Sequence, residues 1–208
     1  WSERDWRFVE MNAEAPASIA YEDVLAEVFL ELPVIQQWAA QRGYNVQALY
    51  ARDRFMQSIE EMWREFRNNR GADRFSARPN IAIVDWDSVP TSSEFDLFQE
   101  YFESRGYKVL ITDPRRLEFT GGRLRDGDFA IDIFYKRVLT SELLAMPDVA
   151  RPITDAYEAG AVCITNSFRA KLLHKKMSLA LLHDDANAHL FSKHELEVIK
   201  KHIPWTRK

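Results

Sequence analysis

The chain of 208 residues is 46% hydrophobic and 12% aromatic, and it carries 28 Lys and Arg against 32 Asp and Glu. A chain of this length and apolar content can bury a sizeable core, which excludes an intrinsically disordered protein. The formal net charge of −4 supplies no basic surplus for a phosphate backbone, so no nucleic-acid partner is expected.

Cysteine content and hydropathy indicate the cellular compartment of the protein. Cys163 is the only cysteine, so the chain can form neither an internal disulfide nor a cysteine-based metal site. No apolar run approaches the ~18–20 residues of a membrane span, and the first residues lack the apolar core of a signal peptide. We therefore expect a cytoplasmic protein with no membrane partner. The start at Trp1 rather than Met indicates a fragment of a longer protein.

An apolar segment near the start, residues 6–12, is expected to form a strand. Side chains two positions apart share one face of a strand, so Glu10 and Asn12 would lie side by side, ~6–7 Å apart. A carboxylate and a carboxamide are hard oxygen ligands, which suit Mg²⁺ and the phosphates that it carries. Taken alone, such a pair is more often an ordinary solvated strand face.

Two helical regions follow this segment. Residues 21–40 carry apolar side chains at helical spacing that Pro33 interrupts, which predicts two short helices. Residues 45–67 carry a wide apolar stripe, which predicts one long amphipathic helix that ends at residues 68–71. The aromatic side chains of this stripe are expected in the core.

From residue 80 onward, strand and helix patterns alternate. A hairpin is expected at residues 117–124, with its turn at Gly121 and Gly122. The alternation predicts an α/β fold, with a mostly parallel Rossmann-like sheet and helices on both faces. The expected strands are 81–85, 107–112, 129–135 and 162–165, and the expected helices are 93–105, 141–159, 167–182 and 193–203.

Polar residues follow several of these strands. Parallel sheets bind ligands beyond the carboxyl ends of their strands. Asp85 ends the first expected strand and Asp87 comes shortly after it, and Lys136 and Arg137 follow the third. The two aspartates allow a receiver-like phosphoacceptor site, but the hairpin breaks the alternation that such a domain requires. A strand end also turns polar simply because it reaches water.

The last third of the chain is rich in cations and histidines. The expected helix 167–182 includes Lys175 and Lys176, and a run of cations is by itself usually a solvated helix face. His183 and His189 flank two aspartates, but their spacing does not match that of a zinc site. A polar loop between helices is the simpler interpretation.

Four short segments in order resemble a known family. They are Val9–Ala17, with the pattern E-x-N, then Asp132–Arg137, Asp155–Gly160, and Leu172–Ser178, with its paired lysines. Together they are similar to glutathionylspermidine synthases and to the wider group of circularly permuted ATP-grasp proteins, which includes eukaryotic glutathione synthetase.

The resemblance implies an ATP-dependent carboxylate–amine ligase that acts through an acylphosphate, with ATP and Mg²⁺ as cofactors. Its partners would be a small-molecule or peptide carboxylate and an amine. Glu10 and Asn12 would hold the metal, and Lys175 or Lys176 would contact the nucleotide phosphates. Arg137 would bind the substrate carboxylate, since its planar fork suits that group. We expect its guanidinium to face an open pocket. Lys136 takes this role if the match is shifted by one residue.

The resemblance also implies an organisation of the chain. Residues 1–70 would supply a strand and a helical segment of the ATP-grasp part, residues 80–190 a Rossmann-like, pre-ATP-grasp-like substrate domain, and residues 191–208 a helix that leads to an ATP-grasp lobe. Ala15 and Ala17 replace two threonines of the family pattern, so the identities of the acid and the amine stay open. The fragment alone is expected to be inactive, and its oligomeric state stays open.

An alternative from a different functional class fits the same features. The chain could be a non-catalytic Rossmann-like module that binds a peptide or a small acid. In that case the polar strand ends would bind a ligand without any transfer of a phosphoryl group.

Overall fold

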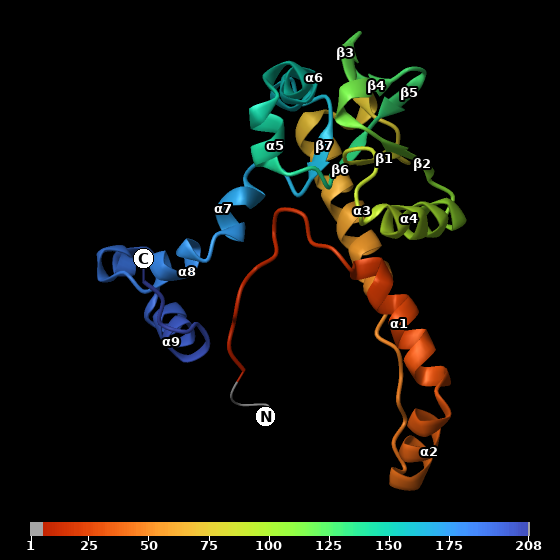
Figure 1. The fold of residues 1–208 in the computed structure, drawn as a ribbon. Helices are drawn as coiled ribbons and strands as arrows, with labels where there is room; N and C mark the ends of the chain where they lie inside the picture. Colours follow the sequence, from red (N-terminus) through yellow and green to blue (C-terminus); the bar gives the residue numbers. More distant parts are fainter. Residues whose placement is uncertain (1–5, 208) are drawn as a thin grey trace. The chain divides into compact units, whose positions relative to one another are not determined.

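A computed structural model describes residues 6–207. Figure 1 shows its helices and strands. The elements are α1 (Ile19–Glu31), α2 (Pro33–Arg42), α3 (Ala51–Arg70), η1 (Ala72–Arg74), β1 (Asn80–Val84), α4 (Ser92–Ser104), β2 (Lys108–Thr112), η2 (Pro114–Arg116), β3 (Glu118–Thr120), β4 (Arg123–Asp126), β5 (Phe129–Ile131), β6 (Ile133–Lys136), α5 (Thr140–Ala145), α6 (Pro147–Glu158), β7 (Cys163–Thr165), α7 (Ala170–His174), α8 (Met177–Leu182), η3 (Asp185–Leu190) and α9 (Lys193–His202).

The chain divides into two compact units. The central unit comprises Pro16–Thr165, and the terminal unit comprises the described residues up to Ala15 together with those from Asn166 onward. This division does not follow the expected segments 1–70, 80–190 and 191–208. Helix α3 belongs to the same unit as the sheet, and the E-x-N segment belongs to the same unit as the last helices.

The central unit contains a four-stranded parallel sheet in the order β2-β1-β6-β7. β1 and β6 are the inner strands and pair with each other in parallel, for example Ile83 with Tyr135. The predicted α/β fold with a parallel sheet is confirmed.

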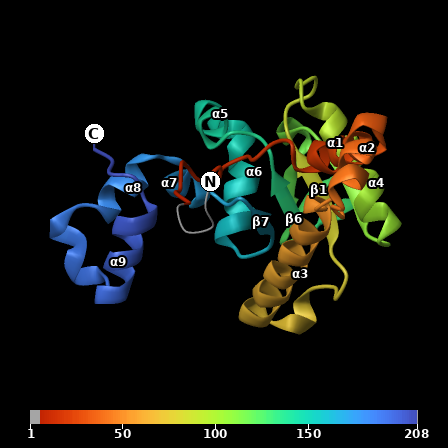
Figure 2. The same ribbon diagram turned by 90° about the horizontal axis from the view of Figure 1, so that it is seen from below.

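Alternate side chains of the sheet point to two different helical layers. Ile81, Ile83, Ile133, Tyr135 and Cys163 point to one face, where they form a core with buried side chains of α3 and α4. The residues between them, such as Ala82 and Phe134, point to the other face and are also fully buried. Figure 2 shows α6 on the side of the sheet opposite α3 and α4. Continuous burial on both faces explains the nearly uninterrupted apolar runs of β1 and β6.

A smaller antiparallel sheet, β3-β4-β5, contains the predicted hairpin. The prediction of a single strand at residues 129–135 is wrong. This segment divides at Asp132 into β5 and β6, which belong to different sheets. The buried Asp132 carboxylate accepts a bond from the Asn80 amide at 2.9 Å and another from Arg123. These contacts fix the point at which the chain leaves one sheet and enters the other.

Two long helices predicted in the second half of the chain are each divided. The predicted helix 141–159 breaks between α5 and α6 because Pro147, at the first position of α6, has no backbone N–H to donate to the preceding turn. The predicted helix 167–182 breaks at Lys175, whose backbone is extended (φ −78°, ψ 125°). Lys175 and Lys176 therefore lie at a helix junction and not on one continuous helical face.

The strand predicted at residues 6–12 is also wrong. The described part of this segment is extended but carries no strand. The Phe8 amide donates a backbone bond to the His202 carbonyl at 2.8 Å, but a strand requires a ladder of such bonds. Trp6 stacks on the His202 ring at 3.9 Å between centroids, so side-chain contacts hold the segment against α9.

The two helices predicted at residues 21–40 are confirmed as α1 and α2, with Pro33 at the first position of α2. No residue of α2 is buried, and this hairpin extends away from the sheet of the central unit (Figure 1). Among the helices of residues 6–207, none is both long and apolar enough to cross a bilayer.

Candidate functional site

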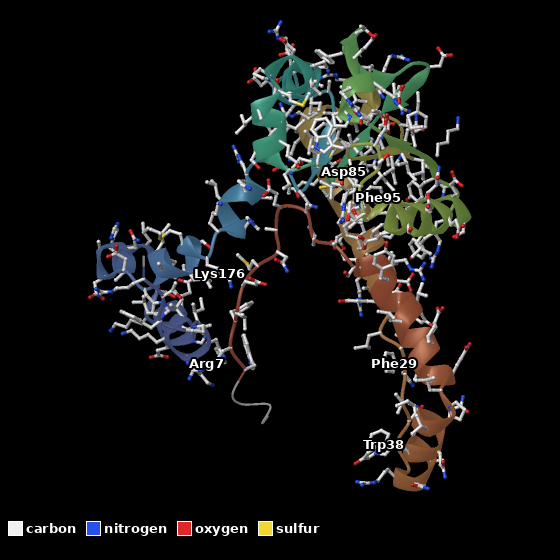
Figure 3. The ribbon with its side chains drawn as sticks, in the orientation of Figure 1. Arg7, Phe29, Trp38, Asp85, Phe95 and Lys176 are labelled. Carbon is white, nitrogen blue, oxygen red and sulfur yellow. The ribbon has the colours of Figure 1, made fainter. Side chains whose placement is uncertain are left out.

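The carboxyl edge of the parallel sheet gathers the polar strand ends. β1 is followed by Asp85, β2 by Asp113 and β6 by Arg137, while β7 ends at Thr165. All four belong to the central unit, and Figure 3 shows Asp85 and Phe95 at this edge. In a parallel sheet these ends lie together, at the position where α/β proteins bind ligands.

Arg137 lies directly after the inner strand β6, as expected, but its guanidinium is enclosed. Its side chain is only 3% exposed, and Nη2 donates to Glu94 Oε2 at 3.2 Å. Nη1 donates to the Tyr135 hydroxyl at 3.2 Å and to the Pro16 carbonyl. The guanidinium lies over the rings of Phe95 and Tyr135, at 5.3 and 5.7 Å. The expectation that it faces an open pocket is therefore wrong.

Glu94 is the residue that sequence reasoning missed at this position. Its carboxylate is fully buried, and in addition to Arg137 it accepts a bond from the Ala20 amide at 3.2 Å. Glu94 lies in the first turn of α4, where a carboxylate also interacts favourably with the helix dipole. The pair thus joins α1, α4 and β6 around one buried ionic contact, and Arg137 Nε is a buried donor without a partner among the described residues.

Lys136, the alternative to Arg137, is fully buried on the opposite face of the sheet. Its Nζ donates to the Val138 carbonyl at 3.1 Å. Because neighbouring residues of a strand point to opposite faces, the Lys136 side chain cannot take the place of the Arg137 side chain beside Glu94.

Asp85 and its neighbours form a second part of this edge. Burial is the main cause that raises the pKa of the Asp85 carboxyl above its usual value. The Trp86 amide donates to Asp85 Oδ1 at 2.9 Å, and the Trp86 indole donates to Glu142 Oε2 at 3.0 Å. A carboxyl with a raised pKa beside a cationic residue is a feature of functional sites, but buried structural pairs also produce it.

A further cluster at the end of β2 contains Asp113, which the sequence interpretation did not select. The fully buried Asp113 carboxylate accepts bonds from Arg115 Nε at 2.7 Å, from the Arg115 amide at 2.9 Å and from the Asp87 amide at 2.8 Å. The side-chain bond from Arg115 is the largest of the causes that lower the pKa of Asp113 to about 2. The position directly after a predicted strand was the available signal for this residue.

The Asp113→Asn variant should be less stable at neutral pH by about 1–3 kcal/mol, because charge-assisted bonds are lost. The pKa of Asp113 is lowered on folding, from 3.8 to about 2. Its contribution is therefore present above pH ~4 and is lost as the pH falls towards 2. Urea unfolding of both proteins from pH 7 to pH 2 measures this difference. A gap in unfolding free energy that is independent of pH would contradict the assignment.

In the terminal unit, the junction of α7 and α8 meets the E-x-N segment. Lys176 Nζ lies 3.0 Å from Glu10 Oε2, with the two side chains 60% and 44% exposed. Lys171 Nζ contacts the buried carboxylate of Glu14. Figure 3 shows Lys176 beside the extended segment that carries Glu10. Of the two predicted lysines, Lys176 contacts the motif carboxylate, whereas Lys175 is the exposed residue at which α7 ends.

These residues fit Mg²⁺ only in company with phosphates. Glu10 and Asn12 supply two hard oxygen donors, and within residues 6–207 no group of three or more His, Cys, Asp or Glu could hold a metal ion. Mg²⁺ commonly takes one or two protein ligands and completes its shell with phosphate oxygens and water. The donor set is therefore compatible with a metal–nucleotide complex and not with a dedicated metal cage.

The sequence-predicted residues fall into two groups. Glu10, Asn12, Lys175 and Lys176 belong to the terminal unit, and Arg137 belongs to the central unit. Chemically, the first group offers paired opposite charges at an exposed surface. The second offers a buried cation whose donors are largely occupied.

Comparisons with known proteins find a likeness among solved structures. No family model matches the sequence, and no curated protein sequence matches it. Among solved structures, a glutathione synthetase-like effector from Globodera pallida matches with a TM-score of 0.64 and 16% sequence identity. The match covers 95% of this chain but 44% of that protein, so the chain spans less than half the length of its structural relative. At this identity the likeness is one of fold.

Proposed function

We propose that this chain is the amino-terminal and substrate-binding portion of a circularly permuted ATP-grasp carboxylate–amine ligase. The observation that carries the proposal is the fold likeness, over 95% of the chain, to a glutathione synthetase-like protein. The four ordered segments of the sequence that resemble this group support the proposal separately from the fold.

In this proposal each group of residues has one task. Glu10 and Asn12 hold Mg²⁺, Lys176 with Lys175 contacts the nucleotide phosphates, and Arg137 orients the substrate carboxylate. Bound ATP supplies the phosphoryl group that activates this carboxylate for attack by an amine. Cationic side chains near the phosphates would offset the charge that develops during transfer.

The contact between Glu10 and Lys176 suits such a site. An ion pair that is about half exposed contributes only ~0–1 kcal/mol, so it opens at little cost. A metal–phosphate complex presents a cation to Glu10 and an anion to Lys176, and both partners exchange one opposite charge for another. The pair therefore keeps the two charges close together before the ligand binds.

The enclosed state of Arg137 sets a condition on its role. A substrate carboxylate must either use the unpartnered Nε or replace Glu94 or the Pro16 carbonyl. The alternative function, a non-catalytic module for a peptide or small acid, is compatible with the same observation, since it gives Arg137 no catalytic role and the buried pair with Glu94 can serve the fold alone.

The test is a titration of the ¹⁵N-labelled chain with Mg-ATP, followed by NMR. We expect weak binding, with a dissociation constant of roughly 1 mM, that shifts the amides of residues 8–14 and 171–178. Lys176→Ala and Glu10→Ala should reduce these shifts strongly. Lys200→Ala, a change in the last turn of α9, is the matched control and should leave them unchanged.

Two outcomes would overturn the assignment. One is the absence of shifts in these segments at millimolar Mg-ATP, which would favour the binding module. The other is a set of shifts that Lys176→Ala does not alter. Mg²⁺ without nucleotide should produce no saturable shift at Glu10 or Asn12, because only two donors are available there.

A further inference from the structure

A small cavity lies near the amino edge of the parallel sheet, on the side covered by α3. Its volume is about 210 Å³. The buried side chains of Met56, Ile59 and Trp63 on α3 form an apolar floor. The walls include Pro79, which precedes β1, and Tyr107, which precedes β2. The cavity is therefore at the opposite edge of the sheet from Arg137 and from the other polar strand ends.

The rim of this cavity is cationic. Arg64 and Arg67 line it from α3. Arg67 Nη2 donates to the Ala72 carbonyl at 3.0 Å, whereas Arg67 Nε is buried and has no hydrogen-bond partner among residues 6–207. A buried donor without an acceptor costs free energy, so the Arg67 guanidinium retains hydrogen-bonding capacity for a ligand.

The acidic residue of the rim is already occupied. Glu60 Oε1 accepts a bond from the Tyr107 hydroxyl at 2.6 Å. Burial, followed by this bond, raises the pKa of Tyr107 to about 12, so the phenol stays protonated and keeps donating to Glu60. The Arg78 guanidinium lies over the Tyr107 ring at 5.0 Å and adds a further positive charge nearby. Glu60 keeps its negative charge, but the two lining arginines and Arg78 outnumber it, so the rim favours an anion over a cation.

We propose that this cavity binds a small amphipathic carboxylate, with a single ring on the floor of Met56, Ile59 and Trp63 and the carboxylate between Arg64 and Arg67. The volume lies below the ~300–1,000 Å³ of pockets for drug-sized ligands, which limits the apolar part to about one ring. A guanidinium group matches a carboxylate in both charge and geometry. This site does not depend on the proposed ligase function.

The first experiment compares three probes of one shape with the intact chain. These are 3-phenylpropionate, its uncharged amide, and 3-phenylpropylamine. Binding is followed through the indole N–H signal of Trp63, which donates to the Ser76 carbonyl beside the cavity. We expect the carboxylate to bind roughly tenfold more tightly than the amide, and the amine not to bind.

Two variants locate the site. Ala77→Phe places a ring in the cavity from its exposed wall and should abolish binding of 3-phenylpropionate. Arg67→Gln should weaken binding roughly fivefold or more and keeps the test valid if Ala77→Phe disturbs the fold. Arg74→Gln is the control, since Arg74 is exposed on η1 and does not line the cavity.

Three results would overturn the proposal. They are equal binding of the acid and the amide, full binding by Arg67→Gln, and no change in the Trp63 signal at millimolar 3-phenylpropionate. The last result would mean that the cavity is a hydrated crevice with no affinity for this class of ligand.

Discussion

Replacing Glu94 by alanine is expected to lower the free energy of unfolding by about 3–5 kcal/mol, because it leaves the Arg137 guanidinium buried without its charge partner. The Arg137 side chain is 3% exposed and that of Glu94 is fully buried. The substitution also removes the acceptor of the Ala20 amide, at the start of α1. Urea unfolding at neutral pH measures the loss.

A second variant separates the ionic contact from simple loss of packing. The double change Glu94→Leu with Arg137→Met should recover most of the lost stability, since well-packed apolar residues can replace a buried pair. Glu100→Ala is the matched control, because Glu100 lies exposed on the same helix and should alter stability by less than about 0.5 kcal/mol. A loss below about 1 kcal/mol for Glu94→Ala would show that water reaches the Arg137 guanidinium.

A further variant, Arg137→Lys, bears on function. If Arg137 anchors a substrate carboxylate, a small carboxylic acid should stabilise the intact chain, and Arg137→Lys should remove that effect, because an ammonium cannot reproduce two parallel bonds. If Arg137 serves the fold alone, Arg137→Lys should lower stability without changing any response to acids.

Elements whose pattern is local could be predicted from the sequence. β1, α4 and β2 follow from an apolar run, a helical stripe and a second apolar run, and the hairpin follows from its paired glycines. Each of these signals lies within about ten residues of chain. The order of the strands in the sheet has no such local signal, because it depends on which distant segments pack together.

Boundaries that depend on distant contacts could not be predicted. The run 129–135 looks like one strand, and only the bonds of Asp132 to Asn80 and Arg123 explain its division. Residues 167–182 look like one helix, but the chain breaks at Lys175, and a single helical face of cations does not form.

The candidate site shows the same limit. The sequence suggested Glu10 and Lys176 separately, through motifs, and the structure places them 3.0 Å apart. Glu94 could not be found from the sequence, since an acid in the first turn of a helix is common and its partner Arg137 lies on another element. A residue that functions only through a tertiary contact leaves no local pattern.

The start of α3 depends on a contact with another helix. The sequence predicted a start at residue 45, but α3 begins at Ala51, where Asp23 of α1 caps it from another helix. The Asp23 carboxylate accepts bonds from the amides of Ala51 and Arg52, at 2.6 and 3.2 Å, and from Arg52 Nε at 2.8 Å. A cap that a distant residue supplies cannot be read from the sequence around the helix.

Asp23→Ala should lower the free energy of unfolding by about 2–4 kcal/mol, because it removes a helix cap and leaves Arg52 without its buried partner. The loss should be concentrated locally, since Asp23 joins the α1–α2 hairpin to α3. Amide hydrogen exchange should therefore accelerate in α1 and in the first turn of α3, while exchange in β1 follows only the global loss. Glu22→Ala, a change of the exposed neighbouring acid, should leave both patterns unchanged. If exchange accelerates equally in β1 and α1, Asp23 stabilises the whole central unit and not the junction of α1 and α3.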